Sequence, residues 1–185
     1  MSISTPNISD RQRARASDAV RGLTNLIGRC DQLIAVDKND QTLNMRQCDL
    51  IEILQKRCSG RMTSSRIKLQ APDKAVVLGD PVWLEVVFGN LLENALKYAP
   101  ANSDIWVSIH QIDDGCSILF ENLEGDVGAP DPDQVFQRYY RNPLAKREIG
   151  SGLGLYIAHN LMALMGGRLD YVPQDQRIGF RVWFP

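Results

Sequence analysis

A run of alternating glycines near the C-terminus is the first feature of the sequence that could do chemistry. Gly150, Gly152 and Gly154 occupy every second position and lead into an apolar helical pattern that extends to residue 167. Glycines at the start of a helix leave backbone N–H groups bare, and such groups bind phosphate oxygens. Taken alone, the stretch is equally typical of a tightly packed structural helix.

A second block, 90–98, combines two amides with a cation and an aromatic ring. Asn90 and Asn94 are four residues apart, so both side chains lie on one face of a helix, beside Lys97 and Tyr98. Amides and a lysine suit a triphosphate with its magnesium ion. A capped or packed helix is again the simpler alternative for this block by itself.

Composition limits what these blocks can belong to. The 185 residues allow one ordinary domain with a small appendage, and 44% hydrophobic residues are enough for a core. The net charge of −1 argues against nucleic acid as the main partner, since backbone binding needs an excess of Lys and Arg.

The cysteines and the N-terminus indicate the compartment. Cys30, Cys48, Cys58 and Cys116 are scattered without a CxxC pair, so we predict neither a zinc site nor disulfides but reduced, cytosolic core residues. No apolar run approaches the roughly 20 residues of a membrane span, and the first residues lack a signal-peptide pattern. We therefore expect a cytoplasmic chain, and our hypothesis is that it is a piece of a longer, membrane-anchored parent.

The N-terminal segment, 1–42, is predicted to be separate from the rest. A helix should begin near Asp10, and its apolar residues recur every three or four positions from Val20 to Ile34. One amphipathic helix cannot bury its own stripe, so it either packs on the following domain or dimerises with a second copy, which we favour. The polar turn 37–42 marks the boundary with a domain at 43–185.

The second domain mixes helices and short strands. Asp49 and Asp80 are both placed to cap helices, and Pro81 favours the first helical position after Asp80. We predict three helices: one at 50–58, one from 81 through the asparagine block, and one that follows the glycines and ends at 165. Strands are expected near 67–69 and 75–78, and hairpins join 104–112 with 116–122 and 168–172 with 178–184. A loop is expected at 124–133 and a short helix or turn at 135–141. This pattern predicts an α+β fold, a two-layer sandwich with a mostly antiparallel sheet. A dinucleotide fold and a Walker loop are disfavoured, because the glycines lie near the C-terminus and no GxxxxGK is present.

In order and separation, the blocks resemble the catalytic ATP-binding domain of bacterial sensor histidine kinases. NLLENALKY resembles the N box, VFQRYYR the F box and GSGLGL the second glycine box, and together they cover the chain from about Asp49 to its end. The superfamily also holds type II topoisomerase, heat-shock chaperone and mismatch-repair ATPases. Any one motif is weak evidence, whereas their ordered combination is specific.

The resemblance implies how the residues would act. ATP would lie between the asparagine helix and a lid at 142–149, with Asn94 as the Mg²⁺ ligand and Asn90 beside it. Lys97 would meet phosphate, and Tyr98 would stack on the adenine. Further nucleotide-binding positions implied by the resemblance are Asn122, Arg141, Gly150, Gly152, Leu153 and Gly154. Charges of Lys146 and Arg147 in the lid could assist, although solvated surface positions are more typical of both.

The residue at position 90 indicates whether the phosphoryl group of ATP would be transferred to a protein or lost to water. The superfamily's hydrolases carry a glutamate where this chain has Asn90, and an amide cannot take a proton from water at neutral pH. The resemblance thus favours phosphoryl transfer. Glu93 is the only carboxylate in the block 90–98. A role as a general base is possible for it, but a charge that faces solvent is the simpler interpretation.

The first glycine box departs from the family pattern DxGxG. Its aspartate, which accepts a hydrogen bond from adenine, corresponds to Asn122, whose amide could still pair with adenine in bidentate fashion. Glu124 and Asp126 replace the two glycines. We expect weaker nucleotide affinity than is usual in the family.

The phosphoacceptor histidine of the family has no counterpart in the chain. His110 lies in a predicted strand and His159 in the last helix, where both are more typical of structural roles. The helix of residues 19–36 resembles the second helix of the family's dimeric hairpin, so the acceptor would lie outside this chain and pass phosphate to a response regulator. The alternatives are a degenerate, non-catalytic nucleotide- or partner-binding module, a superfamily ATPase, or a serine kinase acting on anti-sigma partners; the last two are disfavoured by Asn90 and by the N-terminal helix respectively.

Overall fold

A computed structural model describes most of the second predicted domain. The described residues are 43–58, 64–112, 115–145 and 150–185, with isolated residues 13, 17, 28, 32 and 34. The apolar stripe and dimerisation predicted for the N-terminal helix therefore lie outside the described ranges, as do Lys146 and Arg147.

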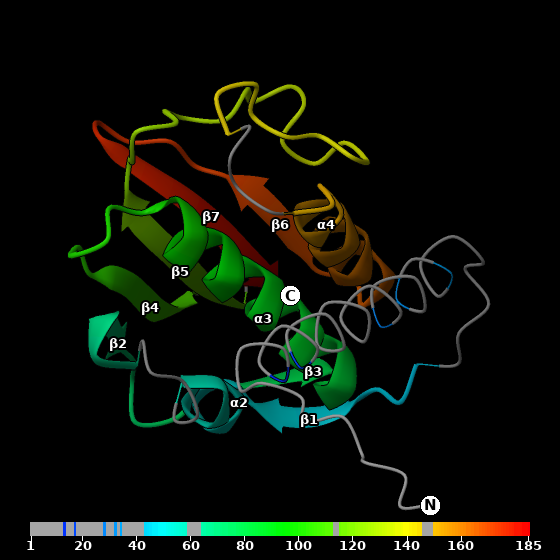
Figure 1. Cartoon of the computed structure of the whole chain (residues 1–185). Helices are drawn as coiled ribbons and strands as arrows, with labels where there is room; N and C mark the ends of the chain where they lie inside the picture. The colour runs from blue at the N-terminus through cyan, green and yellow to red at the C-terminus, as the bar shows by residue number, and fades with distance from the viewer. Residues whose placement is uncertain are drawn as a thin grey trace, which may run out of the picture.

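A five-stranded sheet forms one layer of the fold (Figure 1). Its strand order is β2-β4-β5-β7-β6, and β2 and β4 run parallel while the other neighbours are antiparallel. The strands are β2 (Ile67–Gln70), β4 (Ile105–Ile112), β5 (Gly115–Leu123), β6 (Arg168–Tyr171) and β7 (Arg177–Phe184). Alternate residues of β4, such as Ile105 and Val107, are buried because one face of the sheet packs on helices.

Two helices, α3 (Pro81–Tyr98) and α4 (Gly154–Leu164), pack side by side on that face (Figure 1). Phe88 of α3 is fully buried and meets Phe120 of β5 with ring centroids 5.8 Å apart. Burial of large aromatic side chains of this kind dominates the energy of a core. This contact fixes α3 relative to the sheet.

One further helix and a separate two-stranded sheet form a smaller unit next to α3. The helix α2 (Leu50–Cys58) begins where Asp49 accepts a hydrogen bond from the Ile51 N–H, at 2.9 Å, and α2 packs on α3. A short 3-10 turn, η1 (Ser64–Arg66), follows, and β1 (Arg46–Asp49) pairs antiparallel with β3 (Val76–Gly79). The strand β1 was not predicted from the sequence, and nothing in the sequence pattern separates β3 from the main sheet.

The predicted α+β sandwich is confirmed, with three α-helices and a mixed sheet among the described residues. The stretch 135–141, for which a helix or a turn was expected, consists of turns and bends. Within the described part of the chain, no helix has the length and hydropathy required to cross a bilayer.

Candidate functional site

A cavity of about 230 Å³ lies between α3, the start of α4 and the loop 124–145. Its lining residues extend from Asn90 to Ile178, so it brings together segments that are far apart in the sequence. Ten of the predicted site residues line it: Asn90, Glu93, Asn94, Lys97, Tyr98, Asn122, Arg141, Gly150, Gly152 and Gly154.

The α3 wall presents polar side chains from an otherwise apolar helix. Asn90, Asn94 and Lys97 follow the i, i+4, i+7 spacing that places residues on one helical face. The opposite side of the same turns is buried, through Leu91 and Leu92 among others. Since packing fixes that side, the two amides and the ammonium group are held toward the cavity.

The facing wall is a helix start with bare backbone. Gly152 has φ of 70°, a left-handed conformation that favours glycine, and its carbonyl accepts a hydrogen bond from the Tyr139 N–H at 3.0 Å. The N-cap residue of α4 is Leu153, and no side chain caps the helix. Helix geometry leaves the first N–H groups of a helix without an intrahelical acceptor, and such a helix start is the arrangement that binds anions.

The glycines allow the two walls to approach closely. A Cβ atom added at Gly154 would lie 3.1 Å from Oδ1 of Asn90, and one at Gly150 would lie 2.7 Å from Nζ of Lys97. Any side chain at these two positions would fill the space next to the amide and the ammonium group. Donors, a cation and amide oxygens thus converge on one small volume, a set that fits a metal-chelated polyphosphate.

Lys97 and Tyr98 are held as a pair at the end of α3. Nζ of Lys97 donates to the Tyr98 hydroxyl at 3.0 Å and lies 4.6 Å from the centre of its ring. Gly125 supports the same end of the helix, because a Cβ atom there would lie 2.2 Å from the Tyr98 carbonyl oxygen. The tyrosine ring is thereby fixed at the border of the cavity.

The loop wall is tied together by its own hydrogen bonds. The Asn142 amide donates to the carbonyls of Val127 and Ala129, at 2.9 and 3.1 Å. Arg141 donates through Nη2 to the Ala145 carbonyl at 2.9 Å. These bonds hold 124–145 as a compact wall that has little regular secondary structure.

Asn122 is the most buried polar residue of the cavity. It is 2% exposed and lies on β5, between Ile105 of β4 and Ile178 of β7. Its Nδ2 donates to the carbonyl of the next residue, Leu123, at 2.7 Å. The surrounding end of the cavity is apolar and is formed by Val127, Pro130, Val135 and Ile178.

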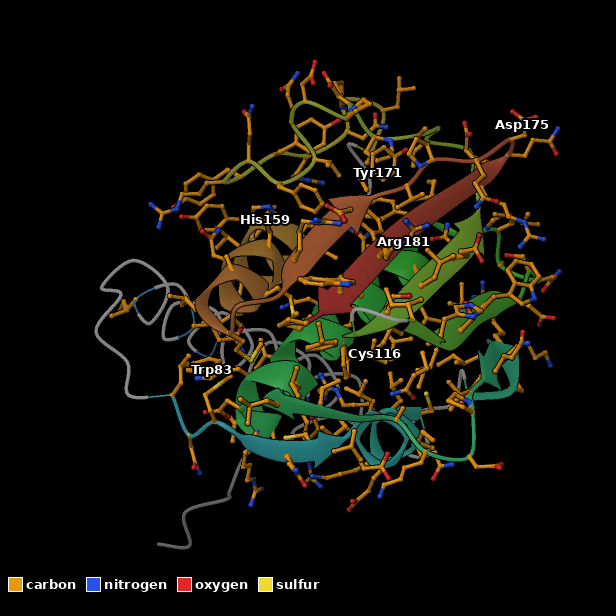
Figure 2. The ribbon with its side chains drawn as sticks, turned by 180° about the vertical axis from the view of Figure 1, so that it is seen from behind. Trp83, Cys116, His159, Tyr171, Asp175 and Arg181 are labelled. Carbon is orange, nitrogen blue, oxygen red and sulfur yellow. The ribbon has the colours of Figure 1, made fainter. Side chains whose placement is uncertain are left out.

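The remaining predicted residues lie elsewhere. Leu153 does not line the cavity; its side chain is 7% exposed and belongs to the hydrophobic core. His110 is exposed near the end of β4, while His159 on α4 stacks on Phe136 with ring centroids 4.7 Å apart. Burial lowers the pKa of His159, an effect that Asp170 partly opposes. Figure 2 shows His159 on the helix behind β6.

No cluster of three His, Cys, Asp or Glu side chains suited to a metal ion occurs among the described residues. The lining offers the amide oxygens of Asn90 and Asn94 and the carboxylate of Glu93, so a cation in this cavity would also need oxygens of the ligand itself. Mg²⁺ tolerates that arrangement, because it commonly binds proteins through few side chains plus substrate phosphates.

Nine residues that line the cavity were not predicted from the sequence. The missed ones are Val127, Gly128, Pro130, Val135, Tyr140, Asn142, Ser151, Leu155 and Ile178. Ile178 was accessible in principle, since the predicted hairpins place it beside Asn122 once the strand order is known. The loop residues had no such signal, because turns and side-chain bonds bring them to the cavity.

Comparison with known proteins defines the class. Residues 79–185 match the model of the family described as Histidine kinase-, DNA gyrase B-, and HSP90-like ATPase. This match covers more than half of the chain, and the chain therefore belongs to this family of ATP-binding domains.

Two proteins with sequences similar to this chain are named as a sensor protein and a histidine-protein kinase. The chain is 37% identical over 122 residues to the swarming motility regulation sensor protein RssA of Serratia marcescens, which covers 64% of this chain and 26% of RssA. It is 31% identical over 154 residues to the signal transduction histidine-protein kinase BaeS of Escherichia coli, covering 80% of this chain and 33% of BaeS. The chain thus spans a third or less of these curated relatives.

Solved structures show the same fold. The histidine kinase AdeS of Acinetobacter baumannii superposes with a TM-score of 0.77 at 18% identity, covering 98% of this chain and 86% of that one. The mycobacterial sensor histidine kinase MprB gives a TM-score of 0.60 at 27% identity, with coverage of 76% and 97%.

Proposed function

We propose that the chain is the ATP-binding catalytic module of a sensor histidine kinase. It would transfer the γ-phosphoryl group of Mg-ATP to a histidine outside this chain, for onward transfer to an aspartate of a response regulator. The observation that carries the proposal is the convergence of Asn90, Asn94 and Lys97 with the uncapped start of α4 in one cavity.

The polar residues divide the work of holding a triphosphate. Asn94, with Asn90 beside it, would hold Mg²⁺, which neutralises phosphate charge when bound. Lys97 and Arg141 would add positive charge, and the N–H groups of the glycine segment would bind phosphate oxygens. Catalysis of this kind consists mainly of positioning, because phosphoryl transfer requires little covalent chemistry from the protein.

The residue types favour transfer over hydrolysis. Asn90 lies against Gly154 and cannot act as a base toward water, since its amide is neutral at physiological pH. Glu93 lines the cavity, but its side chain is exposed and suits a surface charge. Water in the cavity would therefore lack an efficient general base.

The same proposal extends to the rest of the molecule. Residues 1–42 would form the second helix of the phosphoacceptor hairpin and contribute to a homodimer, while 43–185 would form the catalytic domain. The parent protein would be anchored in the inner membrane with this part in the cytoplasm. Support comes from the relatives RssA and BaeS, which are named as sensor or signal-transduction proteins and are longer than this chain.

We also propose that nucleotide affinity is lower than is usual in the family. Glu124 and Asp126 are both exposed and lie in sequence between the cavity-lining residues Asn122 and Val127, so their negative charge opposes a polyphosphate. Substitution of both by glycine is expected to tighten binding of ATP, measured by calorimetry in the presence of Mg²⁺. Unchanged affinity would contradict this part of the proposal.

The test of the function is a transfer assay. The chain is mixed with γ-labelled ATP, Mg²⁺ and a separate helical hairpin of the parent protein that carries the histidine. Label is expected on the hairpin in an acid-labile, base-stable form, and not on a hairpin whose histidine is replaced by alanine. Tight ATP binding without label on the hairpin would refute kinase activity.

A further inference from the structure

The outer face of the five-stranded sheet, which points away from α3 and α4, carries two tryptophans. Along β4 and β7, buried residues alternate with Trp106 and Trp183, whose side chains are partly exposed on the outer face. The strand register places Trp106 beside Glu121 and Trp183 beside Ser117, both on β5. Figure 2 shows the sheet from this side, with Arg181 labelled on β7 and the two helices behind the strands.

Each tryptophan of the outer face lies beside an arginine. The guanidinium carbon of Arg177 is 4.4 Å from the ring centre of Trp106, and that of Arg168 is 5.7 Å from the ring centre of Trp183. Both distances are within the reach of a cation–π interaction, so each arginine is retained next to an aromatic ring. Tryptophan and arginine are among the residue types that most often carry the binding energy of protein interfaces. Two such pairs on one open face indicate a surface to which another molecule binds.

The outer face is positively charged, whereas the whole chain has a net charge of −1. Asp170 lies 2.7 Å from Nε of Arg168 and neutralises its charge. Arg177 and Arg181 have no ion-pair partner among the residues that the structure describes, and Glu121 is the one further carboxylate at the outward positions of β4 to β7. A partner that matches this face must therefore bring carboxylates.

An open hollow at the β2 edge of the outer face provides part of the binding area. Its volume is about 300 Å³, and its lining includes Trp106 and Arg177 together with Lys68, His110 and Glu121. Lys68 adds a second cation to that of Arg177, and the ring of Trp106 supplies apolar surface. The hollow thus suits an apolar side chain that has carboxylates next to it in its own sequence.

The mixture of charges on the outer face favours a protein over other polyanions. A lipid surface or a nucleic-acid backbone presents nearly uniform negative charge, which Glu121 beside Trp106 would oppose. An acidic protein can place carboxylates opposite the arginines and a neutral or basic group opposite Glu121. The partial exposure of Trp106 and Trp183 also suits contact with a complementary surface better than insertion into a bilayer.

We propose that the outer sheet face is a docking surface for an acidic protein segment. Trp106 and Trp183 would be its apolar anchors, and Arg177 and Arg181 would pair with carboxylates of the segment. The cavity lies on the other side of the sheet, where Asn122 is buried. The inference therefore does not rest on the proposed function, and either can fail without the other.

The probe for this surface is a fluorescein-labelled random copolymer of glutamate, lysine and tyrosine in which glutamate is in excess. Fluorescence anisotropy with the 185-residue chain is expected to show saturable binding that weakens as salt is added. Mg-ATP should not displace the copolymer, since the cavity and the outer face are on opposite sides of the sheet. Absence of binding at low salt, or displacement by Mg-ATP, would overturn the proposal.

One substitution tests the charge of the face without altering the core. Arg181→Gln changes an exposed side chain, and we expect copolymer affinity to fall about two- to fivefold. Lys74→Gln is the matched control, because it removes the same charge from an exposed position in the loop between β2 and β3. Affinity should be unchanged in the control. Equal losses in the two variants would show attraction to net charge alone and would overturn the docking surface.

A second pair of substitutions tests the aromatic anchor. Trp106→Ala is expected to weaken copolymer binding about tenfold, whereas Trp83→Ala, which removes a partly exposed tryptophan from α3, should not. The melting temperature of each variant checks its folding. Unchanged affinity of folded Trp106→Ala would overturn the role of the ring, and Arg181→Gln decides the proposal if Trp106→Ala does not fold.

Two further probes distinguish the classes of partner. Phosphatidylglycerol vesicles, measured by cosedimentation, and labelled single-stranded oligothymidylate, measured by anisotropy, are each expected to bind about tenfold more weakly than the copolymer. Glu121→Gln should tighten binding of both, because it removes the charge that opposes a uniform polyanion. Tighter binding of either probe than of the copolymer by the unsubstituted chain would overturn the assignment to a protein partner.

Discussion

The two helices that border the cavity begin in opposite ways. The start of α3 is capped by Asp80, whose Oδ1 accepts hydrogen bonds from the Val82 and Trp83 N–H groups, at 2.9 and 3.4 Å. Its other oxygen accepts from the Asn44 N–H at 2.8 Å. At the start of α4, Leu153 offers no side-chain oxygen, and the preceding residues include glycines.

The difference separates stability from ligand binding. The N–H groups at the start of α3 are satisfied within the protein, so this helix is complete and contributes to the cavity through side chains. No side chain caps the start of α4, so this helix can contribute to the cavity through its backbone. A ligand phosphate would supply for α4 what Asp80 supplies for α3.

The largest effect is expected from the side-chain wall. Asn94→Ala removes the proposed Mg²⁺ ligand, and we expect Mg²⁺-dependent ATP affinity to fall at least 100-fold, or by about 2.7 kcal/mol. The fold should persist, because Asn94 is a partly exposed residue of the cavity lining. Calorimetry with and without Mg²⁺ measures the change, and the melting temperature serves as the check on folding. Undiminished affinity would remove Asn94 from the metal site.

Removal of the cap of α3 is expected to affect stability alone. Asp80→Ala deletes the acceptor for the N–H groups of Asn44, Val82 and Trp83, and we expect a loss of about 2 kcal/mol of unfolding free energy. Asp80→Asn keeps a capping oxygen and should retain most of the stability. Urea denaturation gives both values. An equal loss in ATP affinity, measured far below the unfolding midpoint, would show that the two roles are not separate.

A methyl group on the backbone wall is expected to weaken ATP binding as well as stability. Gly152→Ala forces an L residue to φ of 70° and places Cβ 2.6 Å from the Tyr139 carbonyl carbon. Left-handed backbone costs roughly 1 to 2 kcal/mol, and displacement of the glycine segment should weaken ATP binding about tenfold, or by about 1.4 kcal/mol.

Gly166 provides a matched control for that substitution. It has φ of 77°, but a Cβ atom there would meet nothing within 4 Å, and Gly166 does not line the cavity. Gly166→Ala should carry similar backbone strain with unchanged ATP affinity. If both variants bind ATP equally, then close approach at Gly152 is not important for the site.

The smallest effect concerns the body of α4 and its pH dependence. Burial lowers the pKa of His159 below 6.5, so the unfolded chain binds the proton more readily than the folded one, although Asp170 partly opposes this. The stabilisation that neutral His159 adds to the free energy of unfolding is fully present above about pH 6.5. It declines as the pH falls toward the lower pKa of the folded state. His159→Phe keeps a ring beside Phe136. Between neutral and mildly acidic pH, this variant should lose less stability than the unsubstituted chain. Identical pH profiles in thermal unfolding would contradict the assignment.

Much of the fold could be predicted because local signals agree with it. Asp80 and Pro81 define the start of α3, and alternation along 105–112 and 115–123 defines the central hairpin. The strand β1 was missed because RQCD has no apolar alternation, and pairing with β3 is what makes it a strand. Such pairing depends on distant residues, which a local pattern does not contain.

The candidate site divides in the same way. Asn90 and Asn94 were found because helical spacing alone places them together. Val127 and Val135 were missed because their positions depend on tertiary closure of the loop, through bonds such as that from Asn142 to the Val127 carbonyl. Leu153 shows the converse limit, since it lies within a binding motif yet turns its side chain into the core.

Asn122 lies on the third of five strands, with a hydrogen-bonded neighbour on each side. Deuterium should therefore replace the amide hydrogens of this strand only when the whole sheet opens, while the glycine segment exchanges through local fluctuations. The end of the cavity at Asn122 would then open only as rarely as the domain itself unfolds. The glycine segment could open and close around phosphate many times before a single molecule unfolds.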